Sequence, residues 1–446
     1  MAQRDLIVFS HLGGGFVPAG RLSLTEESGA VVASRFSYGS KYLERPQHFE
    51  IDPVSLGLAN PEKGRVYFPA QGLTQFGGIR DAAPDAWGRR VIEAQRRVPA
   101  NSLPEADYLL GAGSDRVGAL DVRGSLHSPA QFGAATVQSL AYLLEAAERI
   151  ERGEPIPAQL ADMFGAGASA GGARPKASVR DADGVLWLAK FPSQADTFNV
   201  AQAECCTLTL ARLSGMRVPE VKTIDVGGRS VLLVRRFDRT WQSPGATLEG
   251  GIDQPGDGRE EHRLPFVSGL TLVACDEFES RNKSYADLAQ AVRQWVHPGQ
   301  IRANTEELFA RMVFNIFASN DDDHLRNHAF VRDPRHPNAA GWCLSPLYDV
   351  VPRPGVARDR FLHLGVGQQG KLATLDNALS ASAAFMPQRA DAIATVRRIW
   401  GEVRQWQTHF ESQHAPGRLI DQMVPAFRDL DAICSPALQA EIRRGG

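Results

Sequence analysis

Polar side chains are concentrated in the segment ASNDDDHLRNHAFV at 318–331, where three consecutive aspartates are followed by His324 and Asn327. This cluster is too polar for a core and too dense for an ordinary turn. Phosphoryl transfer needs an aspartate that accepts the proton of a substrate hydroxyl, and an asparagine about five residues later that holds Mg²⁺. The run DDHLRN at 322–327 has this spacing. It predicts a phosphoryl-transfer loop, with Asp322 as the base and Asn327 as a metal ligand.

A second carboxylate follows about 20 residues later, after a predicted hairpin. Asp349 comes directly after the apolar and aromatic residues Leu347 and Tyr348. Mg²⁺ is a hard cation that prefers oxygen donors, so Asp349 is the expected second metal ligand. Alone, an aspartate here would more often be a turn or cap residue. Its position after the DDHLRN run favours the metal site.

Only seven of the chain's 49 basic residues are lysines, and two of these seven are candidates for phosphate binding. Lys176 ends the run of small residues GAGASAGGARPKASV at 165–179, and glycines of this kind allow backbone N–H groups to approach phosphate oxygens. Lys190 ends the apolar segment VLWLAKF at 185–191. The alternative for the first segment is a flexible linker, and the alternative for Lys190 is a lysine at the edge of a sheet.

These residues require particular elements around them. The segment 185–191 is rich in β-formers, and 197–214 has helical apolar spacing that stops at Gly215. Glu204 in that helix could fix Lys190 against the α and β phosphates, as in kinases, although a surface glutamate would look the same. Two more strands meet at Gly227 and Gly228, which indicate a hairpin. The second of these strands ends at 235–238, where the chain of a kinase would pass the adenine of ATP. An apolar helix leads into 318.

The rest of the chain is less specific. Residues 1–125 read as short strands and turns with one helical stretch at 84–97, near whose start lie Asp81 and Asp85. A helix is predicted near 135–152, and the Gly-rich, acidic stretch 244–263 is predicted to be a mobile loop. The expected domains are an amino-terminal subdomain at 1–125, a connector helix with a nucleotide-binding lobe at 126–240, and a helical catalytic lobe at 241–446.

Composition excludes several classes of protein. The chain of 446 residues is 43% hydrophobic, long enough for a large core, and its net charge of −2 gives no sign of bulk attraction to nucleic acid. No apolar run reaches the roughly 18 residues of a membrane span, and the first residues lack a secretory apolar stretch, so we expect a cytoplasmic protein. Five scattered cysteines fit reduced thiols rather than disulfides or zinc.

At these residues the sequence resembles the HipA family of serine/threonine kinase toxins, over nearly the whole chain. The motifs that carry the resemblance are FSYGSKYL (36–43), RDAAPDAWGRRVI (80–92), SAGGARPK (169–176), WLAKFP (187–192), VRRFDR (234–239), DDHLRN (322–327) and PLYD (346–349). The resemblance implies an α+β fold with two lobes, like a protein kinase and related to phosphoinositide kinases. It also implies a β-rich amino-terminal subdomain and a mostly helical carboxy-terminal lobe.

The resemblance further implies a catalytic set of Asp322, Asn327 and Lys190, with Mg²⁺ held by Asn327 and Asp349. The residues expected to contact ATP are Gly171, Gly172, Ala173, Lys176, Lys190, Glu204, Arg235, Arg236, Phe237, His324, Asn327, Tyr348 and Asp349. Two features depart from the family pattern. Arg235 replaces a glutamate, which is tolerable if the backbone contacts adenine, and the triple aspartate leaves a choice of register that the spacing to His324 and Asn327 settles for Asp322.

Regulation and partners are expected from the same resemblance. Ser169 falls where family members carry an autophosphorylated serine, and its phosphate would disturb the loop that receives ATP. The expected substrate is a protein of translation, such as an aminoacyl-tRNA synthetase. The expected partner is a helix-turn-helix antitoxin of HipB type that binds operator DNA.

Three other functions remain open. A small-molecule or lipid kinase could use the same loop, because the base needs only an accessible hydroxyl. A catalytically silent corepressor is disfavoured because Lys190, Asp322, Asn327 and Asp349 are all present. A metal hydrolase built on Asp322, Asp323, His324 and His328 has suitable residue types, but adjacent ligands in one short loop fit a single ion poorly.

Overall fold

The structure is a computed structural model, in which residues 1–157, 172–243, 255–256, 258–333 and 341–444 are described. Contacts divide the chain into two compact units, each discontinuous in sequence. The first contains 1–195, 224–274 and 331–339, and the second contains 196–223, 275–330 and 340–446. The predicted division into three consecutive domains stays a prediction.

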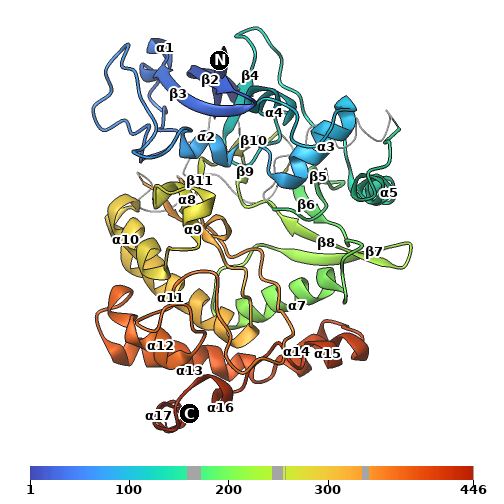
Figure 1. The fold of residues 1–446 in the computed structure, drawn as a ribbon, viewed down its shortest axis with the longest axis vertical. Coiled ribbons are helices and arrows are strands. Elements are labelled where there is room, and N and C mark those ends of the chain that lie inside the picture. Colours follow the sequence, from blue (N-terminus) through green and yellow to red (C-terminus); the bar gives the residue numbers. More distant parts are fainter. Residues whose placement is uncertain (158–171, 244–254, 257, 334–340, 445–446) are drawn as a thin grey trace. The chain divides into compact units, whose positions relative to one another are not determined.

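Four antiparallel strands form an amino-terminal sheet of the first unit, in the order β3-β2-β1-β4 (Figure 1). They are β1 (Ala2–Leu12), β2 (Gly15–Glu27), β3 (Ala30–Tyr38) and β4 (Leu120–Arg123). Alternate apolar side chains, among them Leu6, Val8, Leu22, Leu24 and Phe36, bury one face. The prediction of short strands was wrong, because β1 and β2 have 11 and 13 residues.

The single helical stretch predicted for this region was also an underestimate. Four helices are present: α1 (Ser40–Leu43), α2 (Gly77–Asp81), α3 (Ala86–Arg96) and α4 (Glu105–Gly111). Asp85 caps α3 by accepting a hydrogen bond from the amide of Gly88. Asp81, predicted near the start of the same helix, instead ends α2. It is buried and accepts hydrogen bonds of 2.7 Å from the hydroxyls of Ser268 and Thr271.

A second sheet of four strands has the order β5-β6-β8-β7. Its strands are β5 (Lys176–Arg180), β6 (Leu186–Lys190), β7 (Val221–Val226) and β8 (Arg229–Arg235). The predicted hairpin between the last two is confirmed, and Gly227 and Gly228 have the positive φ angles that glycine tolerates. One face packs with α3 and with α5 (Leu140–Glu151), which follows η1 (Val137–Ser139). The helix predicted near 135–152 is therefore confirmed.

Short elements complete the first unit: β9 (Arg239–Gln242), β10 (Glu260–Arg263), β11 (Phe266–Ser268) and α8 (Gly269–Leu272). Of the predicted mobile loop at 244–263, residues 244–254 and 257 lie outside the described residues. Its end was predicted wrongly, because β10 pairs antiparallel with β9. Glu261 fixes this strand by an ion pair of 2.7 Å with Arg180.

The second unit is mainly helical. Its elements are α7 (Val200–Leu213), α9 (Glu277–Ser280), α10 (Tyr285–Trp295), η3 (Pro298–Gln300), α11 (Ile301–Ala318), η4 (Leu325–Asn327), β12 (Ala329–Val331), β13 (Cys343–Leu344), α12 (Leu375–Ser380), η5 (Ser382–Ala384), α13 (Arg389–Val403), α14 (Trp406–Ser412), α15 (Gly417–Met423), α16 (Leu430–Ile433) and α17 (Pro436–Arg443). Helix α11 packs against α10 and α13, and all its residues from Leu308 onward are buried. The buried helix predicted before 318 is confirmed.

Within the described parts of the chain, no helix is long and apolar enough to cross a membrane. All five cysteines are free thiols. Burial raises the pKa of Cys205 to about 11 and that of Cys206 to about 12, so these two thiols stay protonated at neutral pH.

Candidate active site

The loop that follows α11 is held together by its own backbone and by Asn327. Ser319 ends the helix in the left-handed conformation, with φ of 51°. The amide of His324 donates to the carbonyl of Asp322, and Nδ2 of Asn327 donates to the same oxygen at 2.9 Å. Asn327 is buried, so its amide is fixed in one orientation with Nδ2 occupied. Its Oδ1 is the oxygen left to accept or ligate.

The three consecutive aspartates lie in different environments. The Asp322 side chain is 57% exposed and forms a 3.0 Å ion pair with Arg353, which also pairs with Asp321 at 2.9 Å. Burial is the main cause that raises the pKa of Asp321. The sequence reasoning missed Arg353, although it lies only four residues after Asp349.

Asp323 is buried and has several partners. One of its carboxylate oxygens accepts from the Tyr285 hydroxyl at 2.5 Å and the Asn315 amide at 2.8 Å, and lies 2.9 Å from Nε2 of His328. Burial opposes ionisation of Asp323, but His328 and the Tyr285 hydroxyl outweigh it and lower its pKa. Asn315, a polar residue within a buried stretch of α11, was the signal in the sequence that such a partner was needed.

Tyr348 joins the segment of Asp349 to the same loop, because its hydroxyl donates to the carbonyl of Arg326 at 2.7 Å. Asp349 is partly buried and has a φ of 59°, in the left-handed region. Aspartate visits this region more readily than most residues, and such backbone positions cluster at functional sites. The second unit thus brings the predicted residues Asp322, Asn327, Tyr348 and the backbone of Asp349 into one connected region.

His324, another predicted residue, faces a second histidine. The rings of His324 and His363 meet edge to face, with centroids 5.7 Å apart. Burial lowers the pKa of His363, and the positive charges of His324 and Lys371 add to this effect. His363 was not predicted.

The two predicted lysines are cross-strand neighbours in the first unit. Lys176 on β5 lies directly opposite Lys190 on β6, and Lys190 lies opposite Leu232 on β8. The residues that alternate with them, including Ala177 and Ala189, belong to the core shared with α3 and α5. Both lysines therefore lie on the opposite face of the sheet.

The side chain of Lys176 is largely buried and has close neighbours. The Lys176 side chain is 5% exposed, and its Nζ lies 3.4 Å from the Asp85 carboxylate, a partner that the sequence reasoning did not foresee. Gly172 has a φ of 112°, which L side chains rarely adopt, so the position favours glycine. A Cβ there would lie 2.5 Å from Lys176 Nζ. Ala173 is exposed beside it. The predicted Gly171 and Ser169 lie outside the described residues.

The predicted adenine-contacting segment ends β8. The Arg235 guanidinium lies 5.9 Å from the ring centroid of Trp241, and the Phe237 ring stacks with Phe266 at 6.5 Å. The amide of Arg236 donates to the carbonyl of Leu186 at 3.0 Å, so this N–H is already paired within the sheet.

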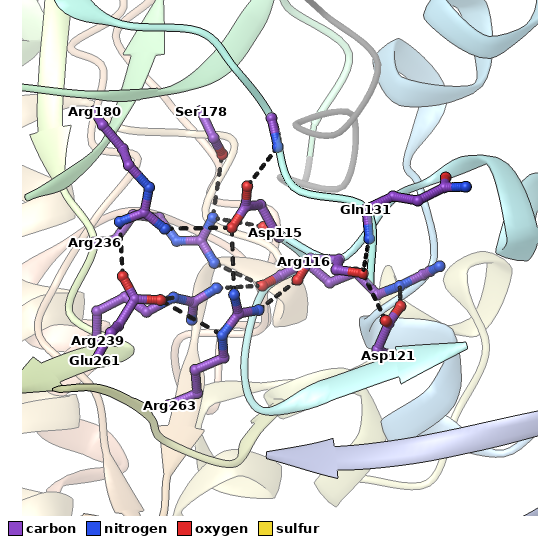
Figure 2. Close-up of polar contacts among 12 residues, drawn as sticks. Asp115, Arg116, Asp121, Gln131, Ser178, Arg180, Arg236, Arg239, Glu261 and Arg263 are labelled. Carbon is purple, nitrogen blue, oxygen red and sulfur yellow. Dashed lines mark hydrogen bonds and ion pairs between the residues drawn. The ribbon is translucent and has the colours of Figure 1, made fainter. Parts of the chain in front are cut away.

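The Arg236 side chain enters a buried polar cluster that the sequence reasoning missed. Its guanidinium pairs with Asp238. It also donates to the carbonyls of Asp115 and Arg116 (Figure 2). Burial opposes ionisation of Asp238, but Arg236 and Arg239 lower its pKa far below the ordinary value. The cluster therefore holds the end of β8 rigidly.

Glu204, predicted to orient Lys190, is buried on α7. It belongs to the second unit and Lys190 to the first, so their pairing stays a prediction. In the described residues no group of three or more His, Cys, Asp or Glu side chains could hold a metal ion. Asp323 and His328 bond to each other instead, which removes two of the ligands that the hydrolase hypothesis needs.

Comparison with known proteins identifies similar chains. The family model of the HipA-like C-terminal domain matches residues 168–407. "Putative kinase Y4mE" of Sinorhizobium fredii is 25% identical over 335 residues, which cover 71% of this chain and 71% of that protein. "Putative kinase Y4dM" of the same organism is 26% identical over 180 residues. That match spans 38% of this chain and only 37% of Y4dM.

Among solved structures, a chain in the complex of the Shewanella oneidensis MR-1 toxin–antitoxin system HipA, HipB and its operator DNA is similar, with a TM-score of 0.61 and 16% identity. The match covers 98% of this chain and 95% of that one. This likeness confirms the predicted α+β fold with two lobes.

Proposed function

The chain belongs to the family of the HipA-like C-terminal domain, and from this premise we propose that it is an ATP- and Mg²⁺-dependent serine/threonine protein kinase of the HipA toxin type. The observation that carries the proposal is the arrangement of the loop after α11. It presents an exposed carboxylate at Asp322 and a fixed amide at Asn327, while Asp323 is buried and has several partners.

Asp322 is the base of the proposed reaction. Its carboxylate is more than half exposed, so a substrate hydroxyl can reach it and give up its proton as the oxygen attacks phosphorus. Asp323 cannot take this role without losing its bonds to Tyr285, Asn315 and His328. The ion pair with Arg353 restrains the Asp322 side chain.

The metal site would use Asn327 and Asp349. Bound Mg²⁺ would neutralise phosphate charge. The residues fit this role, because Nδ2 of Asn327 is occupied by a carbonyl and its Oδ1 remains, and because Asp349 supplies a carboxylate next to Tyr348, which is bonded to the loop. Both donors are oxygen atoms, as a hard cation requires.

The face of the sheet that carries Lys176 and Lys190 is proposed to bind the ATP phosphates. Lys176 and Lys190 are cross-strand neighbours on one face, so two positive charges can act on one polyphosphate. Glu204 is proposed to orient Lys190, and the segment from Arg235 to Phe237 to contact adenine. Ser169 is proposed as the site of autophosphorylation that inhibits the enzyme.

Partners and location follow from the family. We assign a protein substrate of the translation machinery, such as an aminoacyl-tRNA synthetase. We assign an antitoxin of HipB type, since the similar solved structure contains HipB and operator DNA. The proposed location is the cytoplasm.

The test is intact-mass spectrometry of the purified protein after incubation with Mg²⁺ and ATP. Asp322→Asn is compared with Asp321→Asn, because both aspartates pair with Arg353 and are similarly exposed. The native chain and Asp321→Asn should gain phosphate, while Asp322→Asn should be slower by about 10²-fold or more. Phosphate gain by Asp322→Asn at the native rate would overturn the assignment.

A second arm identifies the acceptor. Labelled ATP is added to a cell lysate with the native chain or with Asp322→Asn, and protein and small-molecule fractions are counted separately. Label that depends on Asp322 and appears in protein supports the proposal. Label that appears only in small molecules would replace the protein kinase by a small-molecule kinase.

A further inference from the structure

A pocket of about 250 Å³ lies in the first unit, and its lining contains neither of the two lysines nor any residue of the adenine segment assigned above. It is built from the end of β1, the segment 46–49, strands β9 and β10, and Arg332. Its lining includes His11, His48, His262, Arg263 and Arg332, but no aspartate or glutamate among the described residues. The proposed kinase reaction gives this pocket no role.

His11 is the first sign that the pocket has a ligand. Its side chain is 9% exposed, and Nδ1 has no hydrogen-bond partner in the described structure. A buried ring nitrogen without a partner costs free energy, so such atoms are uncommon unless something else satisfies them. His11 lines the pocket, so the missing partner can arrive there.

Arg332 is the second sign. Its side chain is half-buried, and within the described residues no carboxylate forms an ion pair with it. Arg263, by contrast, is committed to the carbonyl of Ser114 and the carboxylate of Asp115. Arg332 is therefore the guanidinium of the pocket that is available to a ligand.

The two arginines that line the pocket, Arg263 and Arg332, both carry a positive charge. Burial, together with the positive charges of Arg263 and Arg239, lowers the pKa of His11 to about 3. The imidazole is thus neutral at physiological pH and can form a hydrogen bond without adding charge. The positive charges of the lining arginines attract an anion.

We propose that this pocket binds the oxyanion, phosphate or carboxylate, of a small molecule. Arg332 would pair with the anion and His11 would hydrogen-bond to it. The remaining walls include Leu12, Phe49 and Pro265, which suit an apolar body. The volume is slightly below the range of about 300–1,000 Å³ typical of drug-sized ligands, which fits a small metabolite.

The test measures the binding of inorganic phosphate to the full chain by titration calorimetry. Phosphate should bind to the native protein, and Arg332→Gln should weaken binding by about tenfold or more, since a charge-assisted contact is lost. The matched control is Arg35→Gln, which removes an exposed arginine on β3 of the same unit and should leave the affinity unchanged. ATP binding should be the same in all three proteins.

A second variant, His11→Leu, keeps an apolar side chain while removing both ring nitrogens. It should also weaken phosphate binding, with circular dichroism verifying the fold. Acetate is titrated in parallel, and the tighter of the two anions identifies the oxyanion class. The proposal is overturned if neither anion binds, or if phosphate binds Arg332→Gln as tightly as the native chain. The latter result would place phosphate at the nucleotide site instead.

Discussion

Asp322 and Asp323 are neighbours in the chain, but their side chains lie in different environments. The Asp322 carboxylate is exposed and restrained by one arginine. The Asp323 carboxylate is buried between α10, α11 and the loop, where it joins Tyr285, Asn315 and His328. The buried carboxylate of Asp323 has three partners and holds the loop in place. The exposed carboxylate of Asp322 beside it is accessible from solvent.

This difference gives a prediction about stability. Asp323→Asn should lower the free energy of unfolding by about 3 kcal/mol, because a buried charge-assisted network loses its central acceptor. Asp322→Asn should change it by less than about 1 kcal/mol, since exposed ion pairs contribute little. Urea unfolding of the two variants measures both values. Equal destabilisation would show that the two aspartates do not divide the roles in this way.

The loop could be predicted from the sequence because the residues that define it lie close together in the chain. The five-residue spacing between Asp322 and Asn327 becomes a direct contact, in which the Asn327 amide bonds to the Asp322 carbonyl. Tyr285 lies 38 residues before Asp323, and no local pattern shows that they meet. Arg353 was missed for a related reason, since its contact depends on how the chain returns after Asp349.

At the level of elements, the sheet β5-β6-β8-β7 determines what the lysines can do. Strand composition predicted β6 and the hairpin of β7 and β8, because residues with high β propensity and paired glycines are strong local signals. The register that places Lys176 opposite Lys190 is set by pairing between strands. A shift of one residue between these two strands would leave the two lysines on opposite faces of the sheet.

Nucleotide binding should therefore depend strongly on Lys190. Lys190→Met keeps the length of the side chain and its β-sheet position but removes the charge, so ATP affinity should fall about tenfold or more. Lys222→Met, at an exposed position on β7, is the control and should bind ATP normally. Fluorescence titration with an ATP analogue measures both affinities. Undiminished binding by Lys190→Met would remove this lysine from the phosphate site.

A glutamate on β10 should make the free energy of unfolding depend on pH. Burial opposes ionisation of Glu261, but Arg239 and Arg180 outweigh it and lower its pKa to about 2. A carboxylate with a depressed pKa in the folded state contributes stability above its unfolded pKa of about 4.5, and this contribution is lost as the pH falls toward about 2.

Glu261→Gln should consequently be less stable than the native chain by about 3 kcal/mol near neutral pH, and the difference should shrink in acid. Glu260→Gln changes the exposed neighbour on the same strand and should follow the native pH profile. Urea unfolding at about pH 7 and about pH 3 compares the three proteins. A difference between Glu261→Gln and the native chain that stays constant across this range would contradict the prediction.

At the level of the whole molecule, the chain contributes distant segments to each compact unit. The backbone of 114–118 is held by three arginines from another part of the sequence, because its carbonyls accept hydrogen bonds from Arg236, Arg239 and Arg263. The amide of Gly118 donates to Asp238 at 2.6 Å. Buried ion pairs between segments that are distant in the sequence leave no local pattern, so the sequence analysis did not predict these contacts.

Removal of residues 1–125 should therefore unfold the sheet β5-β6-β8-β7 rather than release an independent domain. The truncation takes away α3, which packs on that sheet, and leaves Arg236 and Arg239 buried without the carbonyls of Asp115 and Arg116. Buried guanidinium groups that lose their acceptors are strongly destabilising. The fragment 126–446 should be aggregated or unfolded by gel filtration and circular dichroism, and should not bind ATP. A monomeric, cooperatively folding fragment with native ATP affinity would show instead that the sheet is stable without these contacts.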